Sequence, residues 1–184
     1  MDFELKSLSH QQAARLPVDA LLVLVPDGAD VSGTADAALV SLIREATRRG
    51  DLEPGAGKAL SCYRPQDIKA SWLVLVRSGD GSVSAVRKAV LAGMALLKQP
   101  GVKKLGLMLS LLDRDALAVR VAMMACADAT YCFTTTKPSA KARTISQVFL
   151  GVSDATAARA EFAAGKAQVT GVELAKEWAN RPAN

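Results

Sequence analysis

Ala20–Val25 reads ALLVLV, an unbroken apolar run that Pro26-Asp27-Gly28 ends. A run without polar alternation is typical of a strand that is buried on both faces. Trp72–Val76 (WLVLV) and Leu105–Leu109 (LGLML) have the same character. Because such strands need covering layers above and below, these runs predict a parallel or mixed sheet at the centre of the protein.

Amphipathic segments alternate with these runs. Helices are predicted from about Thr34 to Gly50, from Ser82 to Leu97 and from Asp113 or Asp115 onward, and shorter strands at residues 2–8, 58–63 and 145–152. This order predicts an α/β fold, a three-layer α/β/α sandwich with a mixed, mostly parallel sheet. The predicted inward faces of the second and third helices are Val83, Val86, Val90, Met94 and Leu97, and Leu117, Val121, Met124 and Ala125.

The last segment, residues 153–184, predicts a long helix that begins at a Ser153-Asp154 cap and ends before Pro182. Small and then large apolar residues recur at steps of three and four along one stripe: Ala160, Ala164, Ala167, Gly171, Leu174 and Trp178. The small half suits close approach to a neighbouring element, and Leu174 and Trp178 need a cover. The helix is either a connector to a further domain or a C-terminal helix folded back on its own domain. We divide the chain into an α/β domain, residues 1–152, and this helix with the start of a linker, residues 153–184.

Composition limits the classes of function. The chain has 184 residues, half of them hydrophobic, and a formal net charge of +5, which permits weak attraction to polyanions without requiring it. No basic and apolar leader and no membrane-length apolar run is present, so we expect a soluble, cytoplasmic protein. Cys62, Cys126 and Cys132 form no CxxC pair and are expected to be buried free thiols.

Residues suited to catalysis or metal binding are few. His10 is the only histidine and is expected at the surface, so a triad or a histidine-based metal site is not predicted. The Gly55-Ala56-Gly57-Lys58 stretch lacks the spacing of a phosphate-binding loop. Aspartates at caps and turns are interpreted as structural: Asp27, Asp30, Asp80, Asp113 and Asp154.

Two loops remain as candidate binding sites. Gly28–Thr34 joins a buried strand to a helix N-terminus, a place where α/β sheets bind anions, although a plain connection is the favoured interpretation. The loop from Thr134 to Arg143 carries Lys137, Lys141 and Arg143 and no acid, so it could contact nucleic acid phosphates. Without interleaved aromatic residues, a solvated loop is favoured there too.

The chain resembles the N-terminal domain of the leucyl (cytosol) aminopeptidase family, the hexameric two-metal exopeptidases. The resemblance covers the whole chain in element order and rests on Tyr131-Cys132-Phe133, Thr136-Lys137, the strand Val148–Gly151 and, above all, the tail Gly171–Asn184. In the family a helix of this form ends in Asn-x-Pro-x-Asn, here Asn180 to Asn184, and leads into the catalytic domain.

The resemblance implies a macro-domain-like fold and favours the connector interpretation. The family's metal ligands, catalytic lysine and arginine, and signature motif are absent from this chain, so no catalytic, cofactor-binding or metal-binding residue is assigned. Two divalent metals, manganese or zinc, are expected in the missing catalytic domain, where they would activate water against peptide substrates. The partners implied are that catalytic domain and the other subunits of a homo-hexamer, with no membrane.

Two alternatives stay open. The strand after Asp19 and the Gly28–Thr34 loop suggest a macro-type module that binds ADP-ribose, although the Asn-rich segment and glycine run of that family are missing. The basic residues Lys137, Lys141 and Arg143 suggest a DNA-binding accessory domain, since some bacterial members of the aminopeptidase family act on DNA.

Overall fold

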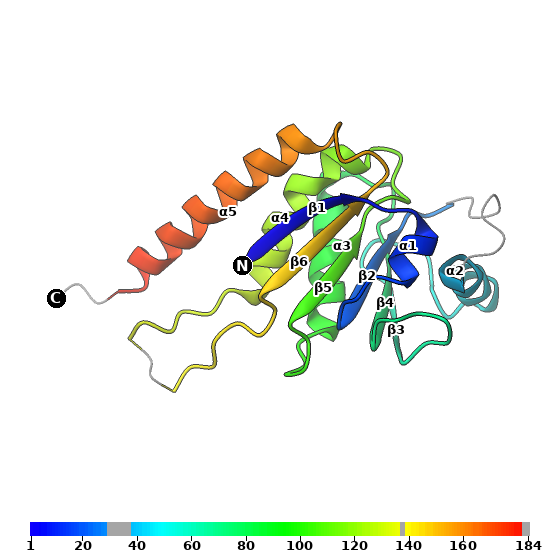
Figure 1. Cartoon of the computed structure of the whole chain (residues 1–184), viewed down its shortest axis with the longest axis horizontal. Coiled ribbons are helices and arrows are strands. Elements are labelled where there is room, and N and C mark those ends of the chain that lie inside the picture. The colour runs from blue at the N-terminus through cyan, green and yellow to red at the C-terminus, as the bar shows by residue number, and fades with distance from the viewer. Residues whose placement is uncertain (29–37, 137–138, 182–184) are drawn as a thin grey trace.

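A six-stranded sheet forms the centre of the protein in a computed structural model that describes residues 1–28, 38–136 and 139–181 (Figure 1). Its strands follow the order β1-β6-β5-β2-β4-β3, and all neighbours run parallel except β3, which pairs antiparallel with β4. The predicted mixed, mostly parallel sheet is therefore confirmed. The strands are β1 (Asp2–Ser7), β2 (Ala20–Val25), β3 (Ala59–Tyr63), β4 (Trp72–Arg77), β5 (Lys104–Met108) and β6 (Gln147–Val152).

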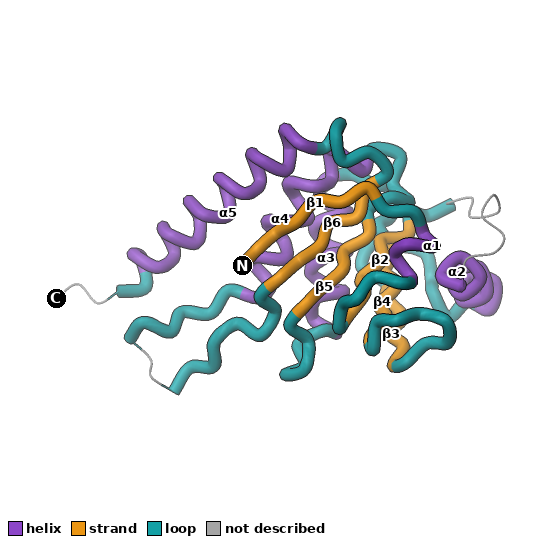
Figure 2. Tube along the Cα trace, in the orientation of Figure 1, coloured by secondary structure: helices purple, strands orange, loops and turns teal. Residues whose placement is uncertain are grey.

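Helices cover both faces of this sheet and complete the three-layer sandwich (Figure 2). On one face lie α1 (His10–Ala14) and α2 (Ala38–Arg49), and on the other lie α3 (Val83–Leu96), α4 (Asp115–Thr130) and α5 (Arg159–Ala179). The short helix α1 was not predicted. A capping box stabilises it, because the Ser9 side chain accepts from the amide of Gln12 while Gln12 Oε1 accepts from the amide of Ser9.

The strand β2 shows why an unbroken apolar run predicts a central strand. Leu22 and Leu24 point into the core beneath α3 and α4, whereas Leu21 and Val23 point into the core beneath α2. Helix α3 approaches this strand closely at Gly93, where an added Cβ would lie 2.4 Å from Leu22 Cδ1. Only glycine allows that distance without rearrangement.

The prediction of inward-facing residues is wrong for two side chains, Val83 and Leu117. Val83 is 66% exposed and Leu117 is 57% exposed. Val83 lies in the first turn of α3, whose buried residues begin at Val86. Helix α4 contacts α3, α5 and β6, so its buried arc is set by residues that fit between neighbouring helices. That arc holds Ala118, Val119, Ala122, Met123, Ala125, Cys126 and Ala127.

Helix α5 packs along α4 and extends beyond the edge of the sheet (Figure 1). Asp154 Oδ1 accepts hydrogen bonds from the amides of Thr156 and Ala157, and the helix begins after that turn, at Arg159. The closest approach is at Gly165, where an added Cβ would lie 2.7 Å from Met123 Sδ on α4.

Candidate functional site

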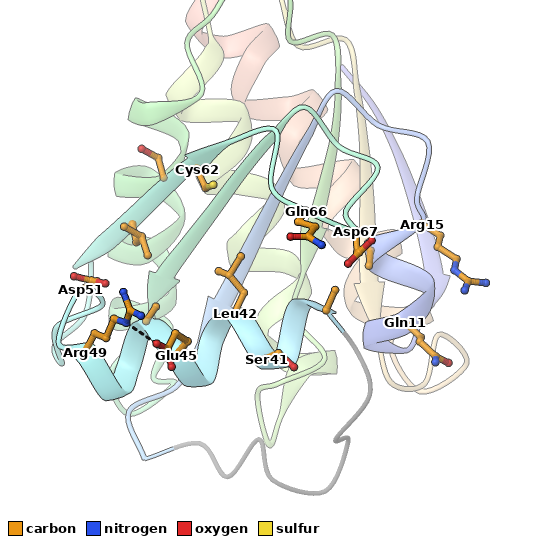
Figure 3. Close-up of a pocket in the computed structure, with 15 residues that line it drawn as sticks. Gln11, Arg15, Ser41, Leu42, Glu45, Arg49, Asp51, Cys62, Gln66 and Asp67 are labelled. Atoms are coloured by element: carbon orange, nitrogen blue, oxygen red, sulfur yellow. Dashed lines mark hydrogen bonds and ion pairs between the residues drawn. The ribbon is translucent and has the colours of Figure 1, made fainter.

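A groove of about 980 Å³ opens between α1, α2 and the edge strand β3 (Figure 3). Its apolar lining includes Ala14, Leu42, Ala46, Leu60 and Cys62. The turn after β3 closes one end, where Arg64 and Asp67 both adopt positive φ. This volume is in the range of small-molecule sites. Whether the groove could support catalysis depends on the protonation and pairing of its polar side chains.

One carboxylate of the groove, Glu45, pairs with two arginines of its own helix. Glu45 Oε1 lies 2.8 Å from Arg48 Nη2 and 2.5 Å from Arg49 Nε. Hydrogen bonds from Arg48 and then Arg49 lower the pKa of Glu45 to about 2, so this carboxylate stays ionised and is unsuited to general acid catalysis near neutral pH. Cys62 is half-buried, and the groove's lining contains no histidine that could activate its thiol. No thiol–imidazole pair is therefore present in the groove's lining.

The basic residues do not form a cluster on the described part of the loop between α4 and β6. Lys141 is exposed, and Lys137 lies outside the described residues. Arg143 is half-buried: its Nη2 pairs with Glu173 of α5, and its Nε donates to the carbonyl oxygen of Thr130 at 3.3 Å. Arg143 therefore attaches this loop to α5, and its charge is already neutralised.

Asp19, one of the residues that suggested an ADP-ribose site, makes hydrogen bonds within the fold. Asp19 lies at the amino end of β2, where its Oδ2 accepts from the amides of Lys103 and Lys104 at 2.9 and 2.8 Å. That is the opposite end of the strands from the one at which α/β sheets bind ligands. Of the Gly28–Thr34 loop, only Gly28 is among the described residues.

The carboxyl ends of β2 and β4 are held by a buried arginine. Arg77 Nη1 donates to the carbonyl oxygen of Pro26 at 3.1 Å, and its Nη2 donates to Thr47 Oγ1 at 2.9 Å. Asp27 Oδ2 accepts from the amide of Gly55 at 3.0 Å. The nearby Lys58 pairs with Glu53 at 2.7 Å.

The cysteines are free, but they are not all buried as expected. Only Cys126 is buried, and burial raises the pKa of its thiol to about 12. Cys62 is half-buried on the edge strand, and Cys132 is exposed because the chain leaves α4 just before it. His10, expected at the surface, is half-buried at the start of α1; burial lowers its pKa, and its Nε2 has no hydrogen-bond partner.

Among the residues that the structure describes, no group of three or more His, Cys, Asp or Glu side chains could hold a metal ion. In the same part of the chain, no helix combines the length and the apolar character that crossing a bilayer requires.

The stripe predicted along α5 points away from the sandwich. Ala160, Ala164, Ala167, Gly171, Leu174 and Trp178 are all exposed. The residues that pack on α4 and the sheet are Gly165, Val169 and the half-buried Phe162, on the opposite side of the helix. Sequence reasoning missed this inner face, although Gly165 and Val169 stand four residues apart.

The inner side of α5 is also held by charges that sequence reasoning missed. Lys176 Nζ lies 2.7 Å from Asp128 Oδ1 on α4, and Asp128 Oδ2 lies 2.9 Å from Arg87 Nη1 on α3. Burial of the Asp128 carboxyl opposes ionisation, but hydrogen bonds from Lys176 and Arg87 outweigh it and lower the pKa. The spacing of Glu173, Lys176 and Glu177 could have predicted these ion pairs, because it places the three charges near the Val169 side of the helix.

With this geometry established, comparison with known proteins identifies the family. The family model described as "Cytosol aminopeptidase family, N-terminal domain" matches residues 22–140. The chain belongs to the cytosol aminopeptidase family. It corresponds to the N-terminal domain of that family.

Relatives within the cytosol aminopeptidase family match over the whole chain. The chain is 43% identical over 184 residues to a probable cytosol aminopeptidase of Verminephrobacter eiseniae and covers 35% of that protein. It is 42% identical over 188 aligned residues to one of Acidovorax ebreus and covers 36% of it. The chain thus spans about a third of the length of these relatives.

Solved structures share the fold. A mutant of tomato leucine aminopeptidase superposes with a TM-score of 0.74 at 14% identity, covering all of this chain and 39% of that one. The bottromycin maturation enzyme BotP superposes with a TM-score of 0.64 at 20% identity, over 90% of this chain and 33% of that one. At these identities the comparison supports the α/β sandwich and nothing finer.

Proposed function

We propose that this chain is the non-catalytic N-terminal domain of a metal-dependent leucyl aminopeptidase. The observation that carries the proposal is the match of the entire chain, at 43% identity, to only 35% of a probable cytosol aminopeptidase. In this proposal the following two-thirds of the protein binds two divalent metals, manganese or zinc, and removes N-terminal amino acids from peptides in the cytoplasm. Residues 1–152 form a domain for packing and assembly into a homo-hexamer, and residues 153–184 lead to the catalytic domain.

We assign no chemistry to the side chains of the described residues. They do not offer a donor set for the two metals, so no step of peptide hydrolysis is assigned to this domain. The groove beside β3 holds a fully ionised Glu45 and no histidine in its lining. Asp19 and Arg143, on which the ADP-ribose and DNA alternatives partly rest, make contacts within the fold.

The test compares two proteins in one assay. The full-length product of the gene and the 184-residue chain are purified and incubated with leucine p-nitroanilide, with manganese or zinc added. We expect turnover by the full-length protein and none by the 184-residue chain. Turnover by the purified short chain would contradict the non-catalytic role, and an inactive full-length protein with either metal would contradict the aminopeptidase proposal.

A further inference from the structure

The outward face of α5 carries no charged residue over its whole length. At about 100° per residue, the positions within roughly 60° of the outward direction form one continuous band. This outward band consists of Ala160, Ala163, Ala164, Ala167, Gly171, Leu174, Ala175 and Trp178, all of them exposed. A helix that stays at a protein surface normally shows the opposite pattern, with charges outward and apolar residues inward.

The charges of α5 lie on its inner side and flanks. Glu173 pairs with Arg143, and Lys176 pairs with Asp128. Glu161 pairs with Arg120 of α4 at 3.1 Å. These pairs hold α5 on α4 in a fixed rotation, so the outward band cannot turn inward without breaking them. Its exposure is therefore a consequence of how the helix is anchored.

The largest side chains of the outward band stand at its C-terminal end. Leu174 is 57% exposed and Trp178 is 62% exposed. The guanidinium of Arg181 lies 4.5 Å from the centroid of the Trp178 ring. Aromatic and aliphatic side chains grouped in this way mark an interaction surface in a soluble protein.

We propose that the outward band of α5 is the contact surface for the polypeptide that follows residue 184 in the same chain. The inference rests on the proposed function, because it requires the downstream domain that the relatives' length implies. Leu174 and Trp178 lie in the last turns of α5, next to the point where that polypeptide continues. The Ala and Gly half allows the backbone of a downstream element to approach closely, and Leu174 and Trp178 fill an apolar recess on it.

The first test measures accessibility in the full-length protein by hydroxyl-radical footprinting, read residue by residue by mass spectrometry. Leu117 on α4 is the matched reference, since it has the same 57% exposure as Leu174. We expect Leu174 to be protected at least about threefold more than Leu117, each relative to the denatured protein. Equal reactivity of the two leucines would overturn the proposal. Protection that disappears when the protein is diluted to monomer would also overturn it, because the cover would then be a second copy.

The second test introduces charge into the outward band. The double variant Leu174→Glu with Trp178→Glu is expected to lower the Tm of the full-length protein by several degrees. The matched control, Leu117→Glu, should leave the Tm nearly unchanged. In the 184-residue chain neither variant should lower the Tm. A full-length Tm that the double variant leaves unchanged would contradict the proposed contact.

The two proposals fail in different ways. If the full-length protein hydrolyses leucine p-nitroanilide but Leu174 and Leu117 react equally, the aminopeptidase assignment stands and the contact surface is wrong. If the full-length protein has no peptidase activity but protects Leu174, the contact stands and the assigned activity is wrong.

Discussion

At the scale of single residues, several of the described aspartates accept hydrogen bonds from backbone amides. Asp115, buried at the start of α4, accepts from the amide and the hydroxyl of Ser153 at 2.5 and 2.6 Å. It therefore joins the N-terminus of α4 to the chain that leaves β6. Asp19 has the same role at the other end of the sheet, where its carboxylate joins β2 to the start of β5.

Asp19 gives a direct test of this role. Asp19→Ala removes the acceptor for the amides of Lys103 and Lys104, and because water can reach these amides we expect a loss of about 1 kcal/mol in the free energy of unfolding. Urea denaturation of the 184-residue chain measures this. The control is Asp51→Ala, because Asp51 is exposed and makes no side-chain hydrogen bond or ion pair with another described residue; it should change stability by less than about 0.5 kcal/mol. Equal effects would show that the two amide contacts add no stability.

At the scale of elements, the contact between α5 and α4 depends on Gly165, which has no side chain to separate the two helices. Gly165 faces Met123, with the Cα of Arg120 3.4 Å from the position of an added Cβ. Gly171, two turns later, has nothing within 4 Å of that position. The two glycines of α5 therefore differ in environment while sharing the same helix.

This difference predicts opposite effects of the same substitution in the 184-residue chain. Gly165→Ala forces α5 away from Met123, and this outweighs the gain in helix propensity, for a net loss of about 1 kcal/mol. Gly171→Ala should stabilise the chain by up to about 1 kcal/mol, since alanine favours the helix and meets no neighbour. Thermal unfolding followed by circular dichroism measures both changes. Stabilisation by both variants would show that α5 does not pack closely on α4.

At the scale of the whole molecule, Asp128 joins three helices through its pairs with Arg87 and Lys176. The lowered pKa of its carboxyl means that the folded state binds a proton more weakly than the unfolded state. The stabilisation by this pair of contacts is therefore complete above the unfolded pKa, near 3.9, and is lost as the pH falls through the lower folded value.

Asp128→Asn is expected to lower the free energy of unfolding by about 1 kcal/mol near neutral pH. The difference from wild type should shrink as the pH falls below about 4, because the wild-type carboxyl then becomes neutral as well. Urea denaturation across this pH range measures it. Glu53→Gln, which breaks an exposed pair with Lys58, should show a much smaller difference at neutral pH. If wild type and Asp128→Asn differed in free energy of unfolding as much in acid as at neutral pH, the charge of Asp128 would not be the source of the stabilisation.

Much of the fold was predictable because local patterns report burial. The runs at Ala20–Val25, Trp72–Val76 and Leu105–Leu109 contain all of β2 and all but one residue each of β4 and β5, since an unbroken apolar run is stable only between two covering layers. The resemblance of the tail and of Tyr131-Cys132-Phe133 indicated the family that the comparisons confirm. Short elements such as α1 were missed, because a single turn with a capping box has too few residues to show a period.

The sequence by itself determined the order of the strands and the longer helices, the mixed sheet and the presence of an apolar stripe on the last helix. Only the tertiary structure decided which way that stripe points. Periodicity places residues on a common face but carries no information about the direction of that face. The close approach at Gly165 and the ion pair between Lys176 and Asp128 fix the rotation of α5, and both depend on residues about forty or more positions away in the chain. Another contact between distant residues, the ion pair with Glu173, neutralises Arg143, which the local sequence places in a basic patch.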